Sequence, residues 1–226
     1  MTDSDIIKAK QAAAEKAVSY LQENMIVGLG TGSTACSAIQ LIGQKVANGL
    51  KIQGVPTSLE TERLAKENNI SLLFEFGQID ITIDGADEVD ESGNLIKGGG
   101  GALTREKIVA AASKKEIIIV DETKLVQTLG RFSLPVEVLP FGWKFVQKKL
   151  QLLGCKANLR KKGEEIFMSD NQNYIFDCIF HNIVHPKELA IEINTIPGVV
   201  ENGLFVDLAD LVIVGHADGS TEEIVF

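Results

Sequence analysis

The chain has 226 residues, of which 45% are hydrophobic and 23% charged, a composition typical of a folded globular protein. A net charge of −9 and a pI of about 4.9 exclude the basic footprint that binding to nucleic acid or to an anionic membrane requires. No apolar run approaches the roughly 20 residues of a membrane span, and the polar N-terminus lacks the apolar core of a signal peptide. Three cysteines without close spacing are typical of reduced thiols, so we expect a cytoplasmic protein.

The first half of the chain alternates helix and strand patterns. We expect helices at 5–22, 34–47, 57–68 and 103–113, and strands at 25–29, 52–55, 71–74, 79–84 and 116–120. Thr57, with Glu60 three residues later, is expected to form a capping box for the third of these helices. Strand–helix units of this size predict an open, mainly parallel, Rossmann-like sheet with helices on both faces.

The pattern changes after about residue 130. Strands are expected at 134–138, 156–160, 164–168 and 174–180, with helices at 141–153 and 186–194. These elements predict a smaller α+β domain of the split βαβ, ferredoxin-like kind. Strands at 204–206, 211–214 and 223–225 are expected to return to the first sheet. The predicted domains are therefore 1–130 with 203–226, the α/β catalytic part, and 131–202, a small domain that we expect to make the oligomer contact.

A glycine-rich segment, Gly28 to Thr34, lies between an expected strand and an expected helix. Glycines let backbone N–H groups approach an anion closely, and a helix N-terminus favours negative charge. The segment is not a P-loop, because it lacks the lysine, and Ser33 replaces the third glycine of a dinucleotide fingerprint. Anion binding and a plain tight turn, capped by Ser33 or Thr34, remain equal alternatives.

Four acids stand within the seven residues Asp84 to Asp90, at the end of an apolar strand. Open α/β sheets bind ligands at the carboxyl ends of their strands, so these carboxylates are candidates for acid–base chemistry or for a divalent metal. The spacing does not fit an EF-hand. Taken alone, the run is more typical of a solvated acidic turn.

The segment Leu95 to Lys107 is the most informative in the chain, because Gly98 to Gly101 are four consecutive glycines between a strand end and a helix start. That placement favours a nest of N–H donors for a developing oxyanion over a mobile surface loop. Lys97 before the glycines and Glu106 after them would bracket such a pocket.

Several other residues carry weaker patterns. Lys124 follows an expected strand and Lys10 lies in the first helix, so either could contact a phosphate, although surface lysines are commoner. His181 and His185 are four residues apart, but Pro186 argues against one helix through both and thus against a metal site. Cys36 near a helix start could have a lowered pKa, although a structural thiol is the commoner interpretation.

Taken in order, these segments resemble the type A ribose-5-phosphate isomerase family over nearly the whole chain. The resemblance is carried by the motifs at Gly30–Thr34, Asp84–Glu88, Lys97–Gly100, Leu103–Lys107, Lys124, Leu134–Val138 and Ile196–Val200. It implies interconversion of D-ribose 5-phosphate and D-ribulose 5-phosphate through an enediolate, in the non-oxidative pentose phosphate pathway. It also implies no metal or organic cofactor, a sugar phosphate as small-molecule partner, and a homodimer or homotetramer.

The resemblance assigns roles residue by residue. Glu106 is implied to be the proton acceptor, with Asp84 and Lys97 as further catalytic residues. The implied substrate-binding residues are Thr31, Gly32, Ser33, Thr34, Asp84, Gly85, Ala86, Asp87, Lys97, Gly98, Gly99, Gly100, Lys124 and Lys10. Two positions depart from the family pattern, since Gln172 stands where glycine is usual and His216 where threonine is more familiar.

Two other classes of function fit parts of the pattern. A sugar-phosphate-sensing module would bind without catalysis, but its DNA-binding relatives carry a helix-turn-helix arm, and the acidic charge argues against DNA. Another sugar-phosphate enzyme of a related fold, such as an amino-sugar phosphate deaminase or a CoA transferase, is the second alternative. A deaminase would be expected to show a histidine near the acids, and none lies there.

Overall fold

Seven strands form the largest of four sheets in a computed structural model that describes residues 1–226. Contacts divide the chain into two compact units. The first unit comprises Met1–Ala86, Arg105–Leu125 and Leu208–Phe226, and the second comprises Asp87–Thr104 and Val126–Asp207. No helix combines the length and the apolar character needed to cross a bilayer.

The seven-stranded sheet belongs to the first unit and has the order β16-β15-β7-β4-β1-β2-β3. All neighbouring strands are parallel except β15 and β16, which are antiparallel. The strands are β1 (Ile26–Leu29), β2 (Gln53–Pro56), β3 (Ser71–Leu72), β4 (Ile81–Asp84), β7 (Glu116–Asp121), β15 (Leu211–Gly215) and β16 (Thr221–Val225). β7 and β15 are buried throughout, as parallel strands covered on both faces must be.

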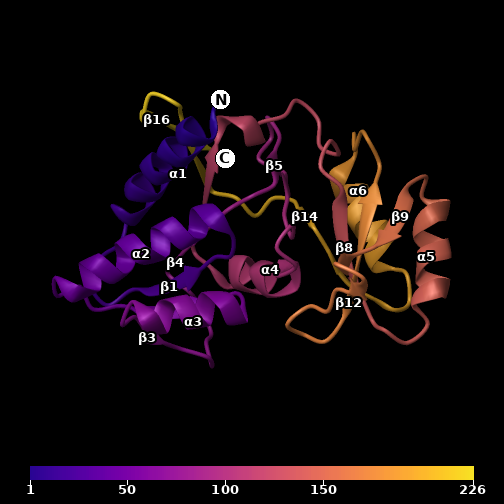
Figure 1. The fold of residues 1–226 in the computed structure, drawn as a ribbon, viewed down its shortest axis with the longest axis horizontal. Helices are drawn as coiled ribbons and strands as arrows, with labels where there is room; N and C mark the ends of the chain where they lie inside the picture. The colour runs from indigo at the N-terminus through magenta and orange to yellow at the C-terminus, as the bar shows by residue number, and fades with distance from the viewer. The chain divides into compact units, whose positions relative to one another are not determined.

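Helices cover both faces of this sheet, as the sequence predicts. They are α1 (Asp3–Val18), α2 (Ser33–Ala47), α3 (Leu59–Glu67) and α4 (Leu103–Ala112), followed by the short 3₁₀ turn η1 (Glu122–Lys124) after β7. One core cluster joins α1, α2 and α3 to alternate residues of β1, β4, β7 and β15. A separate cluster on the other face joins Val109 of α4 to Val55 and Ile79. In Figure 1, α1, α2 and α3 follow one another along the indigo-to-magenta part of the ribbon.

The second unit contains a four-stranded antiparallel sheet, in the order β13-β8-β12-β9, with two helices packed against it. Its elements are β8 (Leu134–Val138), α5 (Trp143–Leu152), β9 (Lys156–Leu159), β12 (Tyr174–Ile179), α6 (Pro186–Asn194) and β13 (Val199–Asn202). A two-stranded ribbon of β10 (Lys161–Lys162) and β11 (Glu165–Ile166) completes this part of the chain. One apolar cluster, including Phe176 and Leu150, fills the space beneath the sheet.

Three further strands of the second unit form a small antiparallel sheet: β5 (Glu88–Val89), β6 (Leu95–Ile96) and β14 (Leu204–Phe205). The prediction that 204–206 returns to the first sheet is therefore wrong, because β14 pairs with β6 instead. The same pairing groups residues 87–104 with the second unit, whereas the sequence-based boundaries placed them in the first. A two-residue strand carries too little pattern to name its partner.

The start of α3 also differs from the expectation. Ser58, not Thr57, is its N-cap, and the Ser58 Oγ accepts the N–H of Thr61. Thr57 is fully buried, and its hydroxyl donates to the carbonyl of Leu29. Serine and threonine are both favoured N-cap residues, so only the backbone geometry decides which of the two caps the helix.

Candidate active site

The carboxyl ends of four neighbouring parallel strands gather most of the predicted site residues of the first unit. β15, β7, β4 and β1 lie side by side in the sheet. The segments that follow them carry Gly30–Thr34 after β1, Asp84–Ala86 at the end of β4, Lys124 after β7 and His216 after β15. The carboxyl ends of parallel strands lie at the same edge of a sheet. The parallel arrangement of these four strands is therefore enough to bring the distant segments together.

The first glycine loop is anchored to Asp84. Its Oδ1 accepts the N–H of Thr31 at 3.0 Å and that of Gly85 at 2.7 Å. A side chain at Gly30 would lie 2.1 Å from the same oxygen and 2.6 Å from the Asp84 Cα, so only glycine fits there. Asp84 is fully buried. It therefore shapes the loop and is not part of a solvated turn.

The hydroxyl of Thr31 is directed towards the start of α3. It lies 2.8 Å from the Thr57 hydroxyl, 3.0 Å from that of Ser58 and 3.2 Å from that of Thr61. This hydroxyl therefore fixes the loop against α3, while the Thr31 N–H is held by Asp84. Gly32, with φ of 105°, is the N-cap of α2 and makes no side-chain cap bond, so neither Ser33 nor Thr34 caps the helix.

A lysine meets the first loop at the N-terminus of α2. Lys10 Nζ donates to Ser33 Oγ at 2.9 Å, although the two residues are 23 positions apart. An ammonium group, a hydroxyl and the positive end of a 15-residue helix together favour an anion. Lys10 was the weakest phosphate candidate in the sequence, because a lysine on an amphipathic helix is ordinarily a surface residue.

Glu106 lies in the first turn of α4 and is only 4% exposed. The carbonyl of Ala112, at the end of α4, accepts the N–H of Ile79 just before β4, so the helix runs back from the carboxyl edge of the sheet to its amino edge. Val109 packs at Gly28 of β1, where an added Cβ would be 2.7 Å from Val109 Cγ1. Glu106 lies three residues before Val109, so it is on the same face of α4 and about 4.5 Å further along the helix axis towards the start of the helix.

Lys124 belongs to η1, which follows β7 directly. Asp121 caps this turn, because its Oδ1 accepts the N–H of Thr123. His216, which follows β15, has its Nδ1 2.9 Å from the Oε2 of Glu122, and Glu122 belongs to the same turn as Lys124. The departure at position 216 thus has a structural account: this imidazole ties the end of β15 to the turn that carries Lys124.

In the second unit, Asp87 and Lys97 lie on either side of the β5–β6 hairpin. Asp87 Oδ2 accepts the N–H of Gly99 at 2.8 Å. Lys97 is 2% exposed, its N–H donates to the Gly203 carbonyl, and its Nζ lies 5.3 Å from the ring centroid of Phe205. The Lys97 ammonium is thus a buried cation that lies near an aromatic ring. The sequence shows only that Lys97 follows an apolar strand, which does not predict this burial.

Arg160 also holds the second glycine loop, and sequence reasoning missed it. Its Nη1 donates to the carbonyls of Gly98 and Gly99, at 3.0 and 3.1 Å. Its Nε and Nη2 bind the two carboxylate oxygens of Asp177. Nothing local marks this arginine, because the residues it joins are about 60 positions away.

The acidic run does not form a solvated turn. Asp84 and Glu88 are buried, and Glu88 accepts the N–H groups of Gly130 and Phe132. Asp90 closes its own turn by accepting from the N–H groups of Ser92 and Asn94. The interpretation of these acids as a solvated turn is therefore wrong, since each carboxylate accepts hydrogen bonds from backbone N–H groups. No three His, Cys, Asp or Glu residues are grouped in a way that could hold a metal ion.

Burial raises the pKa of the Cys36 thiol, and the nearby Glu60 carboxylate raises that pKa further. The suggestion that the start of α2 lowers the pKa of Cys36 is therefore wrong. His181 adopts a left-handed conformation, with φ of 64°, and His185 is the N-cap of α6. The two histidines therefore do not share a helix face, as Pro186 indicated.

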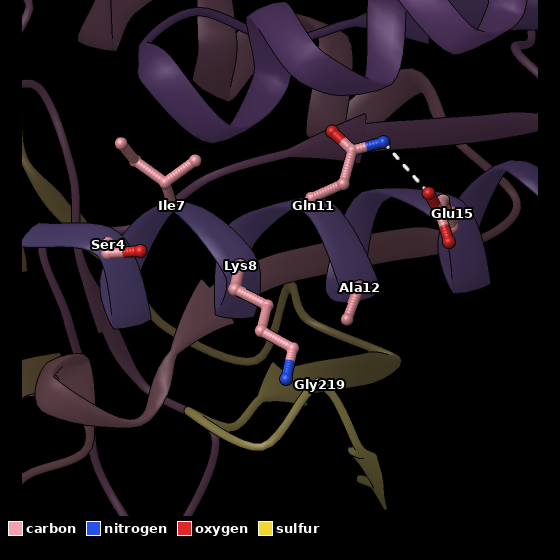
Figure 2. A pocket seen from close by; sticks show the side chains of 7 residues that line it. All are labelled: Ser4, Ile7, Lys8, Gln11, Ala12, Glu15 and Gly219. Carbon is pink, nitrogen blue, oxygen red and sulfur yellow. Dashed lines mark hydrogen bonds between the residues drawn. The ribbon is translucent and has the colours of Figure 1, made fainter.

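A separate groove runs along α1 and is lined by Ser4, Ile7, Lys8, Gln11, Ala12, Glu15 and Gly219 (Figure 2). Its polar groups bind one another or the backbone: Gln11 donates to Glu15, and Lys8 Nζ donates to the Asp218 carbonyl. No predicted site residue lines it, so the candidate active site lies elsewhere.

A parallel sheet that carries a glycine loop, hydroxyls, lysines and buried carboxylates at its carboxyl edge defines an α/β protein that binds small anionic ligands. Comparison with known proteins makes this class specific. Residues 53–219 match the model of the family described as ribose 5-phosphate isomerase A (phosphoriboisomerase A).

Curated relatives match at nearly full length. The ribose-5-phosphate isomerase A of Bacillus cereus is 53% identical over 216 residues, which cover 94% of this chain and 98% of the relative. That of Cereibacter sphaeroides is 49% identical over 226 residues, which cover 96% and 90%. This chain therefore belongs to the ribose-5-phosphate isomerase A family.

Solved structures agree with this assignment. A D-ribose-5-phosphate isomerase in complex with phospho-erythronic acid superposes with a TM-score of 0.94 at 42% identity, covering 98% of this chain and 99% of the other. The ribose 5-phosphate isomerase A of Methanocaldococcus jannaschii superposes with a TM-score of 0.93 at 39% identity, covering 97% and 99%.

Proposed function

We propose that this protein is an aldose–ketose isomerase that interconverts D-ribose 5-phosphate and D-ribulose 5-phosphate, with Glu106 as the base. Membership of the ribose-5-phosphate isomerase A family supports the reaction. The observation that carries the choice of base is the position of Glu106: a buried carboxylate in the first turn of α4, three residues before Val109, which packs at Gly28 of β1. The proton that it moves is the one on C2 of the aldose or C1 of the ketose.

The chemistry follows from the two sugars. Removing the C2 proton of open-chain ribose 5-phosphate gives an enediolate that spans C1 and C2. The proton of the C2 hydroxyl then passes to the oxygen on C1, and returning the carbon-bound proton to C1 gives ribulose 5-phosphate. One carboxylate can do both, because C1 and C2 are adjacent and the same proton is transferred. Donors aimed at the enediolate oxygens would lower the barrier by roughly 3–4 kcal/mol for each well-placed group. We assign this role to the N–H groups of Gly98–Gly100 and to Lys97.

The phosphate end is assigned to the first unit. Lys10 and Ser33 form a cation–hydroxyl pair at the N-terminus of α2, which favours a dianionic group. Lys124, presented by η1, is proposed as a further phosphate ligand. These local positive groups allow a chain of net charge −9 to bind an anionic sugar phosphate.

The remaining roles concern the closed form of the sugar. Opening the furanose ring requires a proton to leave the C1 hydroxyl and another to reach the ring oxygen. Asp84 is proposed to carry the first of these steps, together with Lys97. Asp87 is proposed to orient, because its carboxylate already accepts the Gly99 N–H. Gly85 and Ala86 complete the binding segment after β4. We propose that none of these steps needs a metal or an organic cofactor.

We further propose a cytoplasmic enzyme that acts as a homodimer or homotetramer. Its three free cysteines suit a reducing compartment. An apolar patch in the second unit, formed by Leu139, Phe141 and Phe145, is 47%, 93% and 52% exposed and is the proposed oligomer contact. Light scattering of Phe141→Ser against the unaltered protein tests this contact, and an unchanged oligomer would contradict it.

The activity is tested by a coupled assay of ribose 5-phosphate conversion, with and without a chelator. Turnover that the chelator leaves unchanged is expected. Glu106→Gln should lower kcat by about 10²–10⁴-fold, the usual contribution of a general base. Glu67→Gln, an exposed glutamate of α3, serves as the control. Near-normal turnover by Glu106→Gln, with none by Asp84→Asn, would show that the base is misassigned. Tight binding of ribose 5-phosphate by the unaltered protein without turnover would favour the sensing module.

A further inference from the structure

We propose that Arg160 is a positioning residue for the isomerisation: its guanidinium binds two carbonyls of the Gly98–Gly101 loop and so sets the orientation of the Gly100 N–H towards the ligand. This inference rests on the proposed function of the loop as the binder of the reacting end of the sugar. All the contacts that carry it lie within the second unit.

The guanidinium is itself held rigidly. Arg160 directly follows β9, and Asp177 lies in β12. The Nε and Nη2 of Arg160 donate to the two carboxylate oxygens of Asp177, at 3.0 and 2.5 Å, and so form a bidentate pair. The Arg160 side chain is 12% exposed, and its guanidinium lies over the ring of Phe167, 5.7 Å from the centroid. A planar fork that is paired on one edge and stacked on one face has little freedom left.

The remaining Nη1 of Arg160 binds two successive carbonyls of the loop, those of Gly98 and Gly99. Every peptide bond in the chain is trans, so the C=O of one residue and the N–H of the next point in opposite directions. The N–H groups of Gly99 and Gly100 must therefore leave the loop on the side away from Arg160. The Gly98 carbonyl also accepts the Gly101 N–H, but Arg160 alone holds the Gly99 carbonyl, and a glycine peptide without such a partner rotates easily.

The two N–H groups have different partners. The Gly99 N–H donates to Asp87 at 2.8 Å, which confirms the direction that the geometry requires. Gly100 is exposed, and no residue of the chain accepts its N–H. The Gly101 N–H turns back to the Gly98 carbonyl at 3.0 Å and closes the loop. Gly100 thus offers a preoriented donor, and Arg160 is the group that orients it.

In this arrangement Arg160 acts by orienting a backbone donor, and its own charge does not contact the ligand. A preoriented donor is worth far more than a mobile one for an oxyanion that exists only in the transition state, because no reorganisation is needed at that moment. Loss of Arg160 should therefore lower kcat more than it raises KM. It should also weaken binding of phospho-erythronic acid, a four-carbon sugar-acid phosphate whose planar carboxylate resembles the enediolate, but not binding of inorganic phosphate.

The decisive variant is Arg160→Met, which keeps an unbranched apolar stem and removes every donor. We expect kcat to fall about 10²-fold with KM changed less than about threefold, and the affinity for phospho-erythronic acid to fall by a similar factor to kcat. Arg160→Lys, which keeps the charge but loses the fork, should lose about tenfold. Asp177→Asn should give a smaller loss, and combining it with Arg160→Met should add nothing.

Two controls separate positioning from stability. Leu150→Ala removes a fully buried side chain of the same unit, away from the loop, and should lower the unfolding temperature without changing kcat of the folded enzyme. Arg63→Met removes an exposed arginine of α3 and should change nothing. If Arg160→Met does not fold, Arg160→Lys and Asp177→Asn carry the same comparison.

The outcomes are distinct. Unchanged kcat and unchanged phospho-erythronic acid affinity in the Arg160 variants would overturn the proposal, as would an equal loss of kcat in Leu150→Ala. If the unaltered protein failed to convert ribose 5-phosphate, the proposed function would fail. Calorimetric titration of phospho-erythronic acid against inorganic phosphate, on the unaltered protein and on Arg160→Met, would still decide the role of Arg160 by itself.

Discussion

The two glycine loops of this protein are alike in composition and opposite in the way they are held. The first, Gly28 to Thr34, continues a strand of the parallel sheet. The Gly30 N–H binds the Ile83 carbonyl, the Thr31 N–H binds Asp84, and the Gly30 carbonyl accepts the Thr61 hydroxyl. The second, Gly98 to Gly101, lies outside any ladder and is held by the side chains of Asp87 and Arg160.

Both loops contain glycines with a positive φ, such as Gly32 in the first, but the two loops differ in which main chain passes close to them. In the first, the main chain of β4 passes so close to Gly30 that a Cβ would lie 2.6 Å from the Asp84 Cα. In the second, Gly98 and Gly101 adopt φ of 100° and 86°, which other residues reach only with strain. Close approach is a product of sheet topology, whereas a positive φ is a local choice that distant side chains must hold in place.

The largest effect should come from Glu137, whose carboxylate holds the first turn of α4 just after the second loop. Glu137 is fully buried and accepts hydrogen bonds from Thr104, Ser169, Asn171 and Asn173. Glu137→Ala should lower the free energy of unfolding by roughly 3 kcal/mol or more, because each buried donor left unpaired costs about 1–3 kcal/mol. Urea unfolding measures this, with exposed Glu165→Ala as control. A loss below 1 kcal/mol would show that the fold does not depend on this carboxylate.

The next effect compares the loops directly. Gly30→Ala should cost about 3 kcal/mol, because the backbone of β4 would have to move. Gly99→Ala should cost about 1 kcal/mol, since its Cβ would meet only the carboxylate of Asp87, 2.7 Å away, which can turn aside. Thermal unfolding of the two variants gives the ranking. The reverse order would mean that topology does not hold the first loop more tightly.

A smaller and opposite effect is expected at Gln172, the departure noted in the sequence. Gln172 has φ of 62°, and its N–H binds the Ser169 carbonyl, as in a three-residue hairpin with a left-handed final residue. Gln172→Gly should therefore stabilise the protein, by about 0.5–1 kcal/mol after the added freedom of the unfolded chain is subtracted. Gly163→Gln, with φ of 65° in the two-stranded ribbon, should show the matching loss.

The smallest effect depends on pH and belongs to the first unit. The Lys114 ammonium, and then the Ile26 N–H, hold the pKa of the Asp80 carboxyl below its ordinary 3.8. A lowered carboxyl pKa gives stability that is full above pH 3.8 and is lost as the pH falls through the lower, folded-state pKa. Asp80→Asn should thus be less stable by at most about 1 kcal/mol near neutral pH, with the difference vanishing in acid. Urea midpoints at pH 7 and pH 3 test the sign.

The fold was predictable where a pattern repeats. Parallel strands such as β7 read as continuous apolar runs, and the alternation with helices orders them without knowledge of any contact. Strands β5, β6 and β14 have two residues each and carry no such pattern, which is why the partner of β14 was predicted wrongly. Ser58 and Thr57 are equivalent as caps in composition, so the start of α3 was shifted by one residue.

By itself, the sequence determined which segments are candidates for the chemistry, because strand ends, glycine runs and helix starts can be seen locally. Glu106, Asp84 and Lys97 stand out for that reason. Only the tertiary structure decided which distant side chains hold the segments around them: Arg160 binds Gly98 and Glu137 binds Thr104, each more than 30 residues away, and Lys10 meets Ser33 across 23 positions. Side-chain hydrogen bonds between distant residues leave no period in a sequence, since they depend on where the backbone has already been brought by the packing of its core.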